Sequence, residues 1–367
     1  MAINLVSILL AAGWVVGTVV AARLIGSKPI TVWNTIVGGH VAALGVALGC
    51  VVLLLSPFGF VHVAYVVATL GPALLALSAA IGIWRGWFAD TPAAKGFVAI
   101  LVVPGLVGLW ATHIAPFDLK FEEETVELPC ERSGTDPIRI GVLADIQTPT
   151  IGDYEREAVQ RVMDADPDLI VIAGDIQQGD DPDYNEFNEL FASMSAPHGV
   201  YVVQGDVDRI DEMDTIVSGT GVVWLHNEIV SLSIGDRTVL LGGNEREYYS
   251  ISAVEMHAEL GAAPGEVITL VLTHRPDPAL VLGGSVDLVM AGHTHGGQIA
   301  IPFLGPLHVA SDVPRKVGAG GLHELDGQQI YVSSGVGMER LDAPQVRLFS
   351  PPSIGLLTLE TPASCAS

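Results

Sequence analysis

Six residues of the kinds that bind divalent metal ions recur in the C-terminal two-thirds of the chain. They are Asp145, Asp175, Asp206, His274, His293 and His295. Each stands just after a short apolar run of the kind that forms a buried strand. A single Asp in that position is more often a turn former, but six such residues predict a shared site. Two cations about 3.5–4 Å apart can hold a phosphate between them and activate a water, which is the chemistry of phosphoester hydrolysis.

The segments that must position these residues alternate between strands and helices from Pro137 onward. Strands are predicted at 138–143, 169–173, 200–203, 238–241, 267–272, 286–290, 329–332 and 355–359, and helices at 154–163 and 185–194. Such alternation predicts an α/β fold with at least partly parallel sheets. In open α/β sheets, ligands bind beyond the carboxyl ends of the strands, which is where all six side chains are expected.

Five short motifs carry these residues in a fixed order. They read Ala144-Asp145-Ile146-Gln147, Gly174-Asp175-Ile176-Gln177, Gly205-Asp206-Val207-Asp208, Thr273-His274-Arg275 and Gly292-His293-Thr294-His295. Together they resemble the signature of the calcineurin-like metallophosphoesterase superfamily, over about Pro137 to Glu360. The segments Pro302–Pro306 and Pro351–Thr358 resemble its membrane-associated bacterial phosphodiesterase branch.

The resemblance implies a four-layer α/β/β/α metallophosphoesterase sandwich with a two-metal site at one edge. In that arrangement Asp175 bridges both ions. By resemblance, one ion is completed by Asp145, Gln147 and His295, and the other by Asp206, His274 and His293. A carboxylate suits the bridge because its negative charge offsets the repulsion between two cations.

Three residues depart from the superfamily pattern. Gln147 replaces a His, Asp206 replaces an Asn, and Val207 replaces the His usually placed to protonate the leaving group. The first two changes make the ligand set richer in oxygen, which favours Mn²⁺ or Mg²⁺ over Zn²⁺. We therefore expect two divalent metal ions, with Mn²⁺ preferred to Mg²⁺, Fe or Zn²⁺. The third change costs least for leaving groups that need no protonation.

Two further residues are candidates for catalytic roles. Asp208 is expected to orient a metal ligand or the nearby backbone. Arg275 directly follows His274 and could reach a phosphate oxygen, with a surface salt bridge as the alternative.

The first 117 residues form an apolar region with few charges. The chain has 17 basic and 41 acidic residues, of which the first 117 residues hold four basic and one acidic. The rest of the chain therefore has 13 basic and 40 acidic residues. Four membrane spans are predicted, at Ile3–Ala22, Ile30–Leu55, Val61–Trp84 and Phe97–Thr112. The expected organisation is a membrane region over 1–116, a linker over 117–136, the metallophosphoesterase domain over 137–360 and a C-terminal tail over 361–367.

The few basic residues between the spans predict an orientation. They are Arg23 and Lys28 in the first loop, and Arg85 and Lys95 in the third. The positive-inside rule assigns both loops to the cytoplasm. Four spans then make this a multi-pass protein of the plasma (inner) membrane, with its catalytic domain outside the cytoplasm.

The acidic C-terminal part restricts the expected partners. Its surplus of carboxylates disfavours nucleic acid, whose phosphates bind Lys and Arg. A phosphorylated small molecule or lipid-linked substrate and the membrane itself are the expected partners, and the sequence carries no signal for an oligomeric state. Cys130 and Cys365 flank the domain and could pair in an oxidising compartment, or they could be two unrelated thiols.

The preferred interpretation is a metal-dependent phosphoesterase that hydrolyses a phosphodiester or diphosphate bond, on a membrane-linked substrate. Because of Gln147 and Val207, the alternative is a catalytically weak or inactive pseudoenzyme that binds a phosphorylated ligand or partner at the membrane. A third interpretation makes the spans a transport or sensing module, but they carry almost no ionisable residues.

Overall fold

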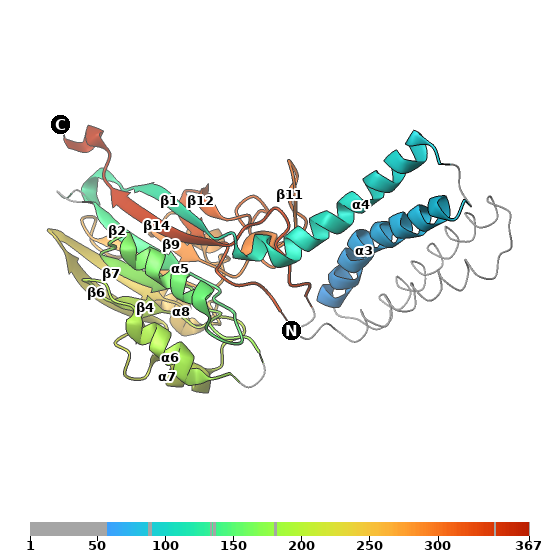
Figure 1. The fold of residues 1–367 in the computed structure, drawn as a ribbon. Coiled ribbons are helices and arrows are strands. Elements are labelled where there is room, and N and C mark those ends of the chain that lie inside the picture. The colour runs from blue at the N-terminus through green and yellow to red at the C-terminus, as the bar shows by residue number, and fades with distance from the viewer. Residues whose placement is uncertain are drawn as a thin grey trace. The chain divides into compact units, whose positions relative to one another are not determined.

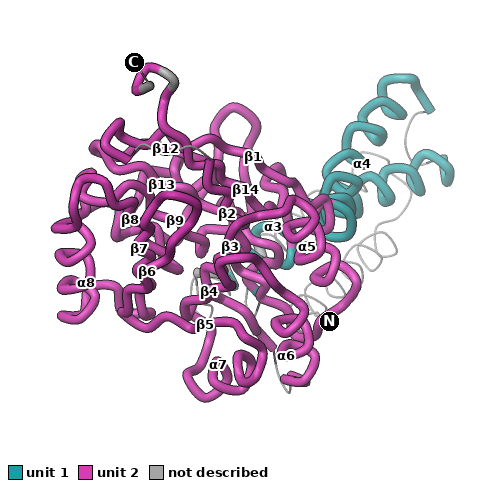
Figure 2. The backbone as a smooth tube through the Cα atoms, turned by 90° about the vertical axis from the view of Figure 1, so that its left-hand side faces the viewer, with its two compact units in different colours: residues 1–114, 340–345 teal, residues 115–339, 346–367 magenta. Residues whose placement is uncertain are grey.

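The structure is a computed structural model, and it describes residues 57–86, 90–132, 134, 137–179, 182–340 and 343–366. The chain divides into two compact units (Figure 2). Unit 1 comprises residues 1–114 and 340–345, and unit 2 comprises residues 115–339 and 346–367. The first two predicted spans, Ile3–Ala22 and Ile30–Leu55, lie outside the described residues, as do Arg23 and Lys28.

The described helices of unit 1 are a pair of apolar helices, α3 (Pro57–Trp84) and α4 (Pro92–His113). The Tyr65 hydroxyl of α3 donates to the Gly108 carbonyl oxygen of α4 at 2.9 Å. A Cβ at Gly108 would come within 2.7 Å of the Thr69 Cβ, so the close approach of the helices requires glycine there. Both helices are long and apolar enough to cross a membrane, and few of their residues are buried. They coincide with the third and fourth predicted spans.

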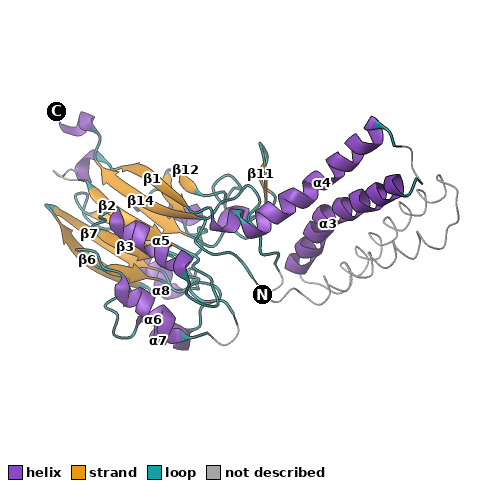
Figure 3. Cartoon of the chain, in the orientation of Figure 1, coloured by secondary structure: helices purple, strands orange, loops and turns teal. Residues whose placement is uncertain are grey.

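Unit 2 is built on two six-stranded sheets (Figures 1 and 3). The first contains, in spatial order, β1 (Lys120–Glu127), β14 (Ser353–Glu360), β2 (Ile138–Leu143), β3 (Leu169–Ile172), β4 (Val200–Val202) and β5 (Val223–Trp224). The second contains β12 (Gly321–Leu325), β13 (Gln328–Val332), β9 (Leu288–Ala291), β8 (Ile268–Leu272), β7 (Arg237–Gly243) and β6 (Glu228–Ile234). Strands β2 to β5 run parallel to one another, as do β7, β8, β9 and β13. The carboxyl ends of each parallel run therefore share one edge of their sheet.

Apolar residues fill three layers around these sheets. The sheets face each other across one core, which includes Ile140 and Val171 from the first and Leu270 from the second. Helices α5 (Asp153–Asp164), α6 (Tyr184–Ser193) and α7 (Ile210–Val217) contribute to a second core on the outer face of the first sheet. Helices α8 (Ile251–Gly261) and α9 (Ala279–Leu282) contribute to a third core on the outer face of the second sheet. This is the α/β/β/α order of layers that the resemblance implies.

The central strands read as unbroken apolar runs because both of their faces are buried. In β3, Leu169 and Val171 face the opposite sheet, whereas Ile170 and Ile172 face the helices. This division follows from the two-residue period of a strand. A strand buried on both faces holds its last residues in place, and the residues that follow it lie at a defined edge of the sheet.

Eight residues of the segment 117–136, predicted as a linker, belong to the first sheet as β1. β1 pairs in parallel with β14 along its whole length, from Lys120 opposite Ser353 to Glu127 opposite Glu360. The linker prediction is therefore wrong for residues 120–127. The edge position explains the error: β1 pairs with a single strand, and Lys120, Glu123 and Glu127 are exposed, so its composition resembles that of a loop.

A disulfide joins the two ends of unit 2. Cys130 follows β1 and Cys365 follows β14, and their sulfur atoms are bonded across a sequence separation of 235 residues. The sequence leaves open whether Cys130 and Cys365 pair or are two unrelated thiols, and in the structure they form a disulfide. A cross-link over such a long loop lowers the entropy of the unfolded chain, which stabilises the fold by about 5 kcal/mol in the chain-entropy model.

Candidate metal centre

The six predicted ligands all follow strands at the edge where the two sheets present their carboxyl ends. Asp145, Asp175 and Asp206 follow β2, β3 and β4, His274 follows β8, and His293 and His295 follow β9. Five of the six fall into two groups that could hold a metal ion. The groups are Asp145, Asp175 and His274, and Asp206, His274 and His293. Within each group the candidate ligand atoms lie within 4.8 Å of one another.

The backbone at this edge adopts conformations that side chains seldom allow. Positive φ angles occur at Asp145 (47°), Gln147 (39°), Asp175 (52°), His293 (71°) and His295 (48°). Left-handed backbone is costly for any residue with a Cβ, and it concentrates at functional sites. The fold also brings Gly205 so close that a Cβ there would overlap the Asp175 carboxylate. The local structure thus tolerates strain in order to bring these side chains together.

The first group is fully buried and joins the two sheets. His274 Nε2 lies 3.4 Å from an Asp175 carboxylate oxygen, and His274 Nδ1 lies 3.7 Å from an Asp145 carboxylate oxygen. The Asp145 carboxylate also accepts the backbone N–H of His293 at 2.9 Å. Asp145 therefore fixes the start of the Gly-His-x-His segment against the first sheet.

The second group is held by two imidazole rings whose hydrogen-bond partners define their tautomers. His274 Nδ1 lies 2.8 Å from the Ala173 carbonyl oxygen, and His293 Nε2 lies 2.6 Å from the Ala310 carbonyl oxygen. A carbonyl oxygen can only accept, so these two nitrogens carry the protons. In neutral rings the lone pairs are then on His274 Nε2 and His293 Nδ1, and these atoms lie 3.1 Å apart.

Four electron-pair donors therefore converge on one place. His293 Nδ1 lies 3.2 Å from an Asp206 carboxylate oxygen, and His274 Nε2 lies 3.4 Å from an Asp175 carboxylate oxygen. Lone pairs and negative charges repel one another at these distances unless a cation lies among them. Burial lowers the pKa of His293 to about 4, with His274 as a secondary cause, and burial also lowers the pKa of His274. Both rings are thus neutral at pH 7, as metal ligands must be, and the donor set fits divalent cations.

The pKa values of the carboxylates in the centre are raised, whereas those of the two histidines are lowered. Burial raises the pKa of Asp175 to about 7 and that of Asp208 to about 6, and it raises the pKa of Asp145 well above its usual value. Neighbouring carboxylates add to each of these shifts. Ionising all three carboxyl groups costs free energy because they are buried and close together. Bound cations would offset this cost with their positive charge.

Gln147, predicted as an unusual ligand, is buried beside an acidic residue that the sequence did not reveal. Its Nε2 donates to a Glu339 carboxylate oxygen at 3.2 Å, and Gln178 Nε2 donates to the other oxygen at 2.8 Å. An amide can offer a metal ion only its oxygen, and the Glu339 contact holds the nitrogen end of the amide. Glu339 lies in a loop after β13, where no motif or periodicity marks it.

His295 belongs to neither three-residue group, although the resemblance assigns it to the first ion. The buried guanidinium of Arg347 donates to the His295 carbonyl oxygen at 2.5 Å, and Ser350 Oγ donates to the same oxygen at 3.1 Å. Arg347 also donates to the carbonyl oxygens of Ser334 and Gly337. This Arg, which the sequence did not single out either, therefore determines the path of the backbone around His295.

Asp208 lies behind the ligands, under the backbone of the motif loops. Its two carboxylate oxygens accept the backbone N–H groups of Asp175 at 2.8 Å, Ile176 at 2.7 Å and Gly205 at 2.8 Å. Asp208 thus joins the loops that follow β3 and β4. These contacts are with the backbone alone, and a role of Asp208 in catalysis stays a prediction.

Arg275 lies at the rim of the centre and pairs with one of the predicted ligands. Its guanidinium donates to an Asp206 carboxylate oxygen at 3.2 Å and to the Ala310 carbonyl oxygen at 3.2 Å, and it lies 3.5 Å from the Asp277 carboxylate. The side chain remains about one-third exposed. This geometry is a salt bridge, and the binding of a phosphate by Arg275 stays a prediction.

The fold and the strand-end ligands define a metallophosphoesterase domain, and comparisons with known proteins agree. Residues 138–297 match the family model described as calcineurin-like phosphoesterase. Unit 2 therefore carries a domain of the calcineurin-like phosphoesterase family, which makes it a phosphoester hydrolase domain with groups that can bind divalent metal.

Relatives occur in bacteria and animals. The chain is 26% identical over 268 residues to the metallophosphoesterase YkuE of Bacillus subtilis, a match that covers 69% of this chain and 89% of the relative. It is 27% identical over 274 residues to a metallophosphoesterase of Aquifex aeolicus, covering 72% and 98%. It is 26% identical over 233 residues to the transmembrane protein with metallophosphoesterase domain of Bos taurus, covering 58% and 51%. The apolar helices of unit 1 and a relative of that name together point to membrane association.

After removal of metal, the stability of the wild type relative to Asp175→Asn is expected to fall between pH 6.5 and pH 8. Asp175 has a folded-state pKa of about 7 against 3.8 when unfolded, so its stabilising contribution is complete below 3.8 and is lost as the pH rises through 7. His293, with a pKa of about 4 folded and 6.5 unfolded, acts in the opposite direction, because its imidazole is still half protonated in the unfolded chain at pH 6.5. The contribution of Asp175 is therefore the difference between chelated wild type and chelated Asp175→Asn, in which the histidine contributions cancel. This difference should fall by about 1 kcal/mol, or about 2–4 °C in Tm, between pH 6.5 and pH 8.

Thermal melting with chelator and with Mn²⁺ measures this directly. Added Mn²⁺ should raise Tm and should do so more at pH 8 than at pH 6.5, because ionised carboxylates bind the ion better. The Tm of chelated wild type minus that of chelated Asp175→Asn should fall as the pH rises from 6.5 to 8. The same dependence of Tm on pH in both chelated proteins would contradict the electrostatics described for the centre.

Proposed function

We propose that unit 2 hydrolyses a phosphodiester or diphosphate bond with a water activated by two divalent cations. The observation that carries this proposal is the convergence of the Asp175, Asp206, His274 and His293 donor atoms, with two imidazole lone pairs facing each other 3.1 Å apart. Such an arrangement of donors has no purpose in a structural core, where polar groups pair donor with acceptor.

In the proposed site, Asp175 would bind both cations. Asp145, Gln147 and His295 would bind one of them, and Asp206, His274 and His293 would bind the other. The bound cations would supply Lewis-acid polarisation of the phosphate and a more acidic water. The protein's own residues supply the geometry: Asp208 fixes the loops that carry Asp175 and Gly205, and the carbonyls of Ala173 and Ala310 fix both imidazole tautomers.

Arg275 is proposed to bind the substrate phosphate. In the structure its guanidinium pairs with Asp206, which is also a proposed metal ligand. If Asp206 were bound to a cation, its pairing with Arg275 would weaken. The guanidinium would then be able to bind a phosphate oxygen, for which its planar arrangement of N–H donors is suited. The ligand set of carboxylates, an amide and three imidazoles favours Mn²⁺, with Mg²⁺, Fe and Zn²⁺ as weaker candidates.

Restoring a general acid by Val207→His is expected to raise kcat/KM for diesters with poor, alkoxide leaving groups by about tenfold. Val207 is half-buried, and its backbone N–H donates to an Asp175 carboxylate oxygen at 3.0 Å, so its side chain starts beside the proposed bridging ligand. Bis-nitrophenyl phosphate should gain little, because nitrophenolate leaves without a proton.

The test is the ratio of the two kcat/KM values within the one variant, so that losses in folding or metal loading cancel. Equal gains for both leaving groups would show that residue 207 does not face the leaving group. If the metal-loaded wild type turned over no phosphodiester or diphosphate at all, the pseudoenzyme alternative would replace this proposal.

The catalytic domain is proposed to lie outside the cytoplasm on a multi-pass plasma-membrane protein. The Cys130–Cys365 disulfide supports this side, because disulfides persist in oxidising compartments. A phosphatase reporter fused to the C-terminus should be active, and a fluorescent protein that matures only in the cytoplasm should stay dark there. Fusions after Asp90, in the loop that contains Arg85, should give the reverse pattern and serve as the control. Cytoplasmic signals from the C-terminal fusions would contradict this orientation.

A further inference from the structure

A short apolar hairpin projects from unit 2 directly after the metal motif. It consists of β10 (Ala300–Ile301) and β11 (Gly305–Pro306), paired antiparallel. Phe303 is 107% exposed, Leu304 73%, Leu307 55% and Ile301 39%. Phe303 also has a left-handed φ of 70°, so the tip adopts a defined turn with its largest apolar side chain outward. Four exposed apolar side chains within seven residues form the kind of patch that marks an interaction site.

The charges around this hairpin differ from those of the rest of unit 2. Residues 293–311 contain no Asp, Glu, Lys or Arg, although the chain beyond residue 117 is strongly acidic. The next basic residues, Arg315 and Lys316, are exposed, and Arg315 donates to the Pro306 carbonyl oxygen at 3.4 Å. Apolar side chains flanked by Arg and Lys are the pattern of a segment that lies in a membrane interface, where the bases bind lipid phosphates.

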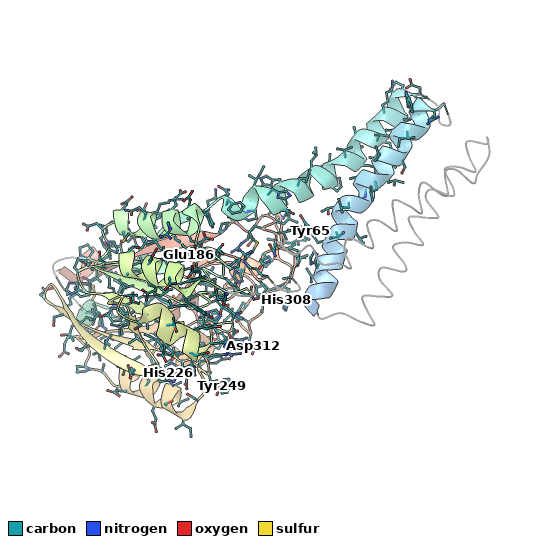
Figure 4. All side chains as sticks on the ribbon, turned by 60° about the horizontal axis from the view of Figure 1, so that its bottom comes forward. Tyr65, Glu186, His226, Tyr249, His308 and Asp312 are labelled. Atoms are coloured by element: carbon teal, nitrogen blue, oxygen red, sulfur yellow. A yellow bond between two sulfur atoms is a disulfide. The ribbon has the colours of Figure 1, made fainter. Side chains whose placement is uncertain are left out.

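The hairpin is attached to the metal centre on both sides. His293 and His295 precede it, and the Ala310 carbonyl that follows it accepts from His293 Nε2 at 2.6 Å and from Arg275 at 3.2 Å. At its base, a Cβ on Gly297 would come within 2.6 Å of Pro306 and of the His308 carbonyl oxygen, so the hairpin packs tightly on the motif. Residues His308 and Asp312, which follow the hairpin in the chain, are labelled in Figure 4. Any molecule or membrane that binds the tip of the hairpin would therefore lie close to the metal centre.

We propose that the β10–β11 hairpin docks into the headgroup region of a phospholipid bilayer and presents the metal centre to lipid-borne phosphates. A bilayer is the favoured occupant because the chain passes from the apolar helix α4 into unit 2 without a spacer, at residues 114–115. The basic pair at the hairpin base adds charge complementarity to anionic lipid. The docking rests on the membrane location in the proposed function, and its consequence for substrate rests on the proposed hydrolysis.

The first experiment places an environment-sensitive fluorophore on the tip of the full chain in lipid nanodiscs. Leu304→Cys is labelled in a Cys50→Ser background, and Ile251→Cys, which replaces an equally exposed apolar residue on α8, is the matched control. Emission from the Leu304 site should shift to the blue and should be quenched by lipids with a nitroxide on the acyl chain. The Ile251 site should show neither effect. Quenching at residue 304 should weaken in Arg315→Gln when the nanodiscs contain phosphatidylglycerol.

This experiment needs no turnover, so it separates docking from catalysis. Equal, low quenching at residues 304 and 251 would overturn the docking proposal. A blue shift without lipid quenching would also overturn it, and would indicate that a second copy of the chain covers the hairpin. Quenching in a protein that hydrolyses no phosphoester would leave docking intact and refute the proposed function instead.

The consequence for substrate has its own measurement. The triple variant Phe303→Ser, Leu304→Ser and Leu307→Ser should lose at least about tenfold in kcat/KM for a phosphodiester carried on a lipid in the nanodisc. Its activity on soluble bis-nitrophenyl phosphate should stay within about twofold of wild type, because the three side chains lie outside the centre. Equal losses on both substrates would show that the hairpin supports the fold of the centre and does not present it to lipid.

Discussion

Asp175→Asn is expected to lower kcat/KM for an activated phosphodiester by about 10³-fold or more. Asp175 belongs to the first candidate metal group and lies 3.4 Å from Nε2 of His274, the residue that both groups share. Its other carboxylate oxygen accepts from the Val207 backbone N–H. A neutral amide cannot offset the repulsion between two cations, so both ions should bind poorly. Asn is the suitable replacement because it tolerates the left-handed backbone at this position, where φ is 52°.

Asp326→Asn is the matched control for this variant. Asp326 also has a positive φ, 50°, but it is exposed in the turn between β12 and β13. Its replacement should leave kcat/KM within about twofold of wild type, since surface changes away from special features have small effects. Wild-type activity in Asp175→Asn would remove Asp175 from the proposed centre.

Arg347→Met is expected to lower the free energy of unfolding by about 3–5 kcal/mol and Tm by about 10 °C. Arg347 is fully buried, and burial lowers the pKa of its guanidinium to about 10. The side chain donates to the carbonyl oxygens of His295, Ser334 and Gly337. Met fills a similar volume but donates nothing, so these buried carbonyls lose their partner.

Thermal melting of the full chain with and without Mn²⁺ tests this expectation. Arg139→Met, in β2, is the control: its guanidinium makes an exposed contact with the Asp166 carbonyl oxygen, and its loss should cost less than about 1 kcal/mol. Because Arg347 also fixes the backbone of His295, the stabilisation by Mn²⁺ should shrink in Arg347→Met. Equal melting temperatures for the two variants would contradict the described role of Arg347.

The sequence predicts the central strands well because their physical signal is local. β2 has the predicted bounds, Ile138–Leu143, and β3, β8 and β13 agree within one residue at each end. These strands are buried on both faces, so they appear as apolar runs bounded by turn residues. β1 was not recognisable from sequence because it lies at the edge of its sheet, and its pairing with β14 joins residues more than 200 apart.

The sequence predicts the part of the candidate centre that consists of motif residues at strand ends. The positions of Asp145, Asp175, Asp206, His274 and His293 could be expected because parallel strands end at one edge. Glu339 and Arg347 could not, because they belong to loops whose paths depend on tertiary contacts with Gln147 and His295. The left-handed backbone at five motif positions is likewise a property of the folded centre, because Asp, Gln and His also occur in ordinary backbone conformations.

In the membrane region, composition predicts where the helices lie but not how they pack. Hydropathy predicts the spans Val61–Trp84 and Phe97–Thr112, and α3 and α4 occupy these segments. The predicted length of a span depends only on apolar composition, whereas the packing of α3 on α4 depends on Gly108 facing Thr69. The orientation from Arg85 and Lys95 remains a prediction, which the reporter fusions described above address.

The most direct test of the proposed centre is the number of metal ions bound to each full-length chain, measured by elemental mass spectrometry after purification with Mn²⁺ and removal of free ion. The proposed ligand set predicts close to two ions per wild-type chain and close to none for Asp175→Asn, with Asp326→Asn equal to wild type. The same ion content in wild type and Asp175→Asn, or a wild-type chain that retains no ion, would contradict a dinuclear metal centre bridged by Asp175.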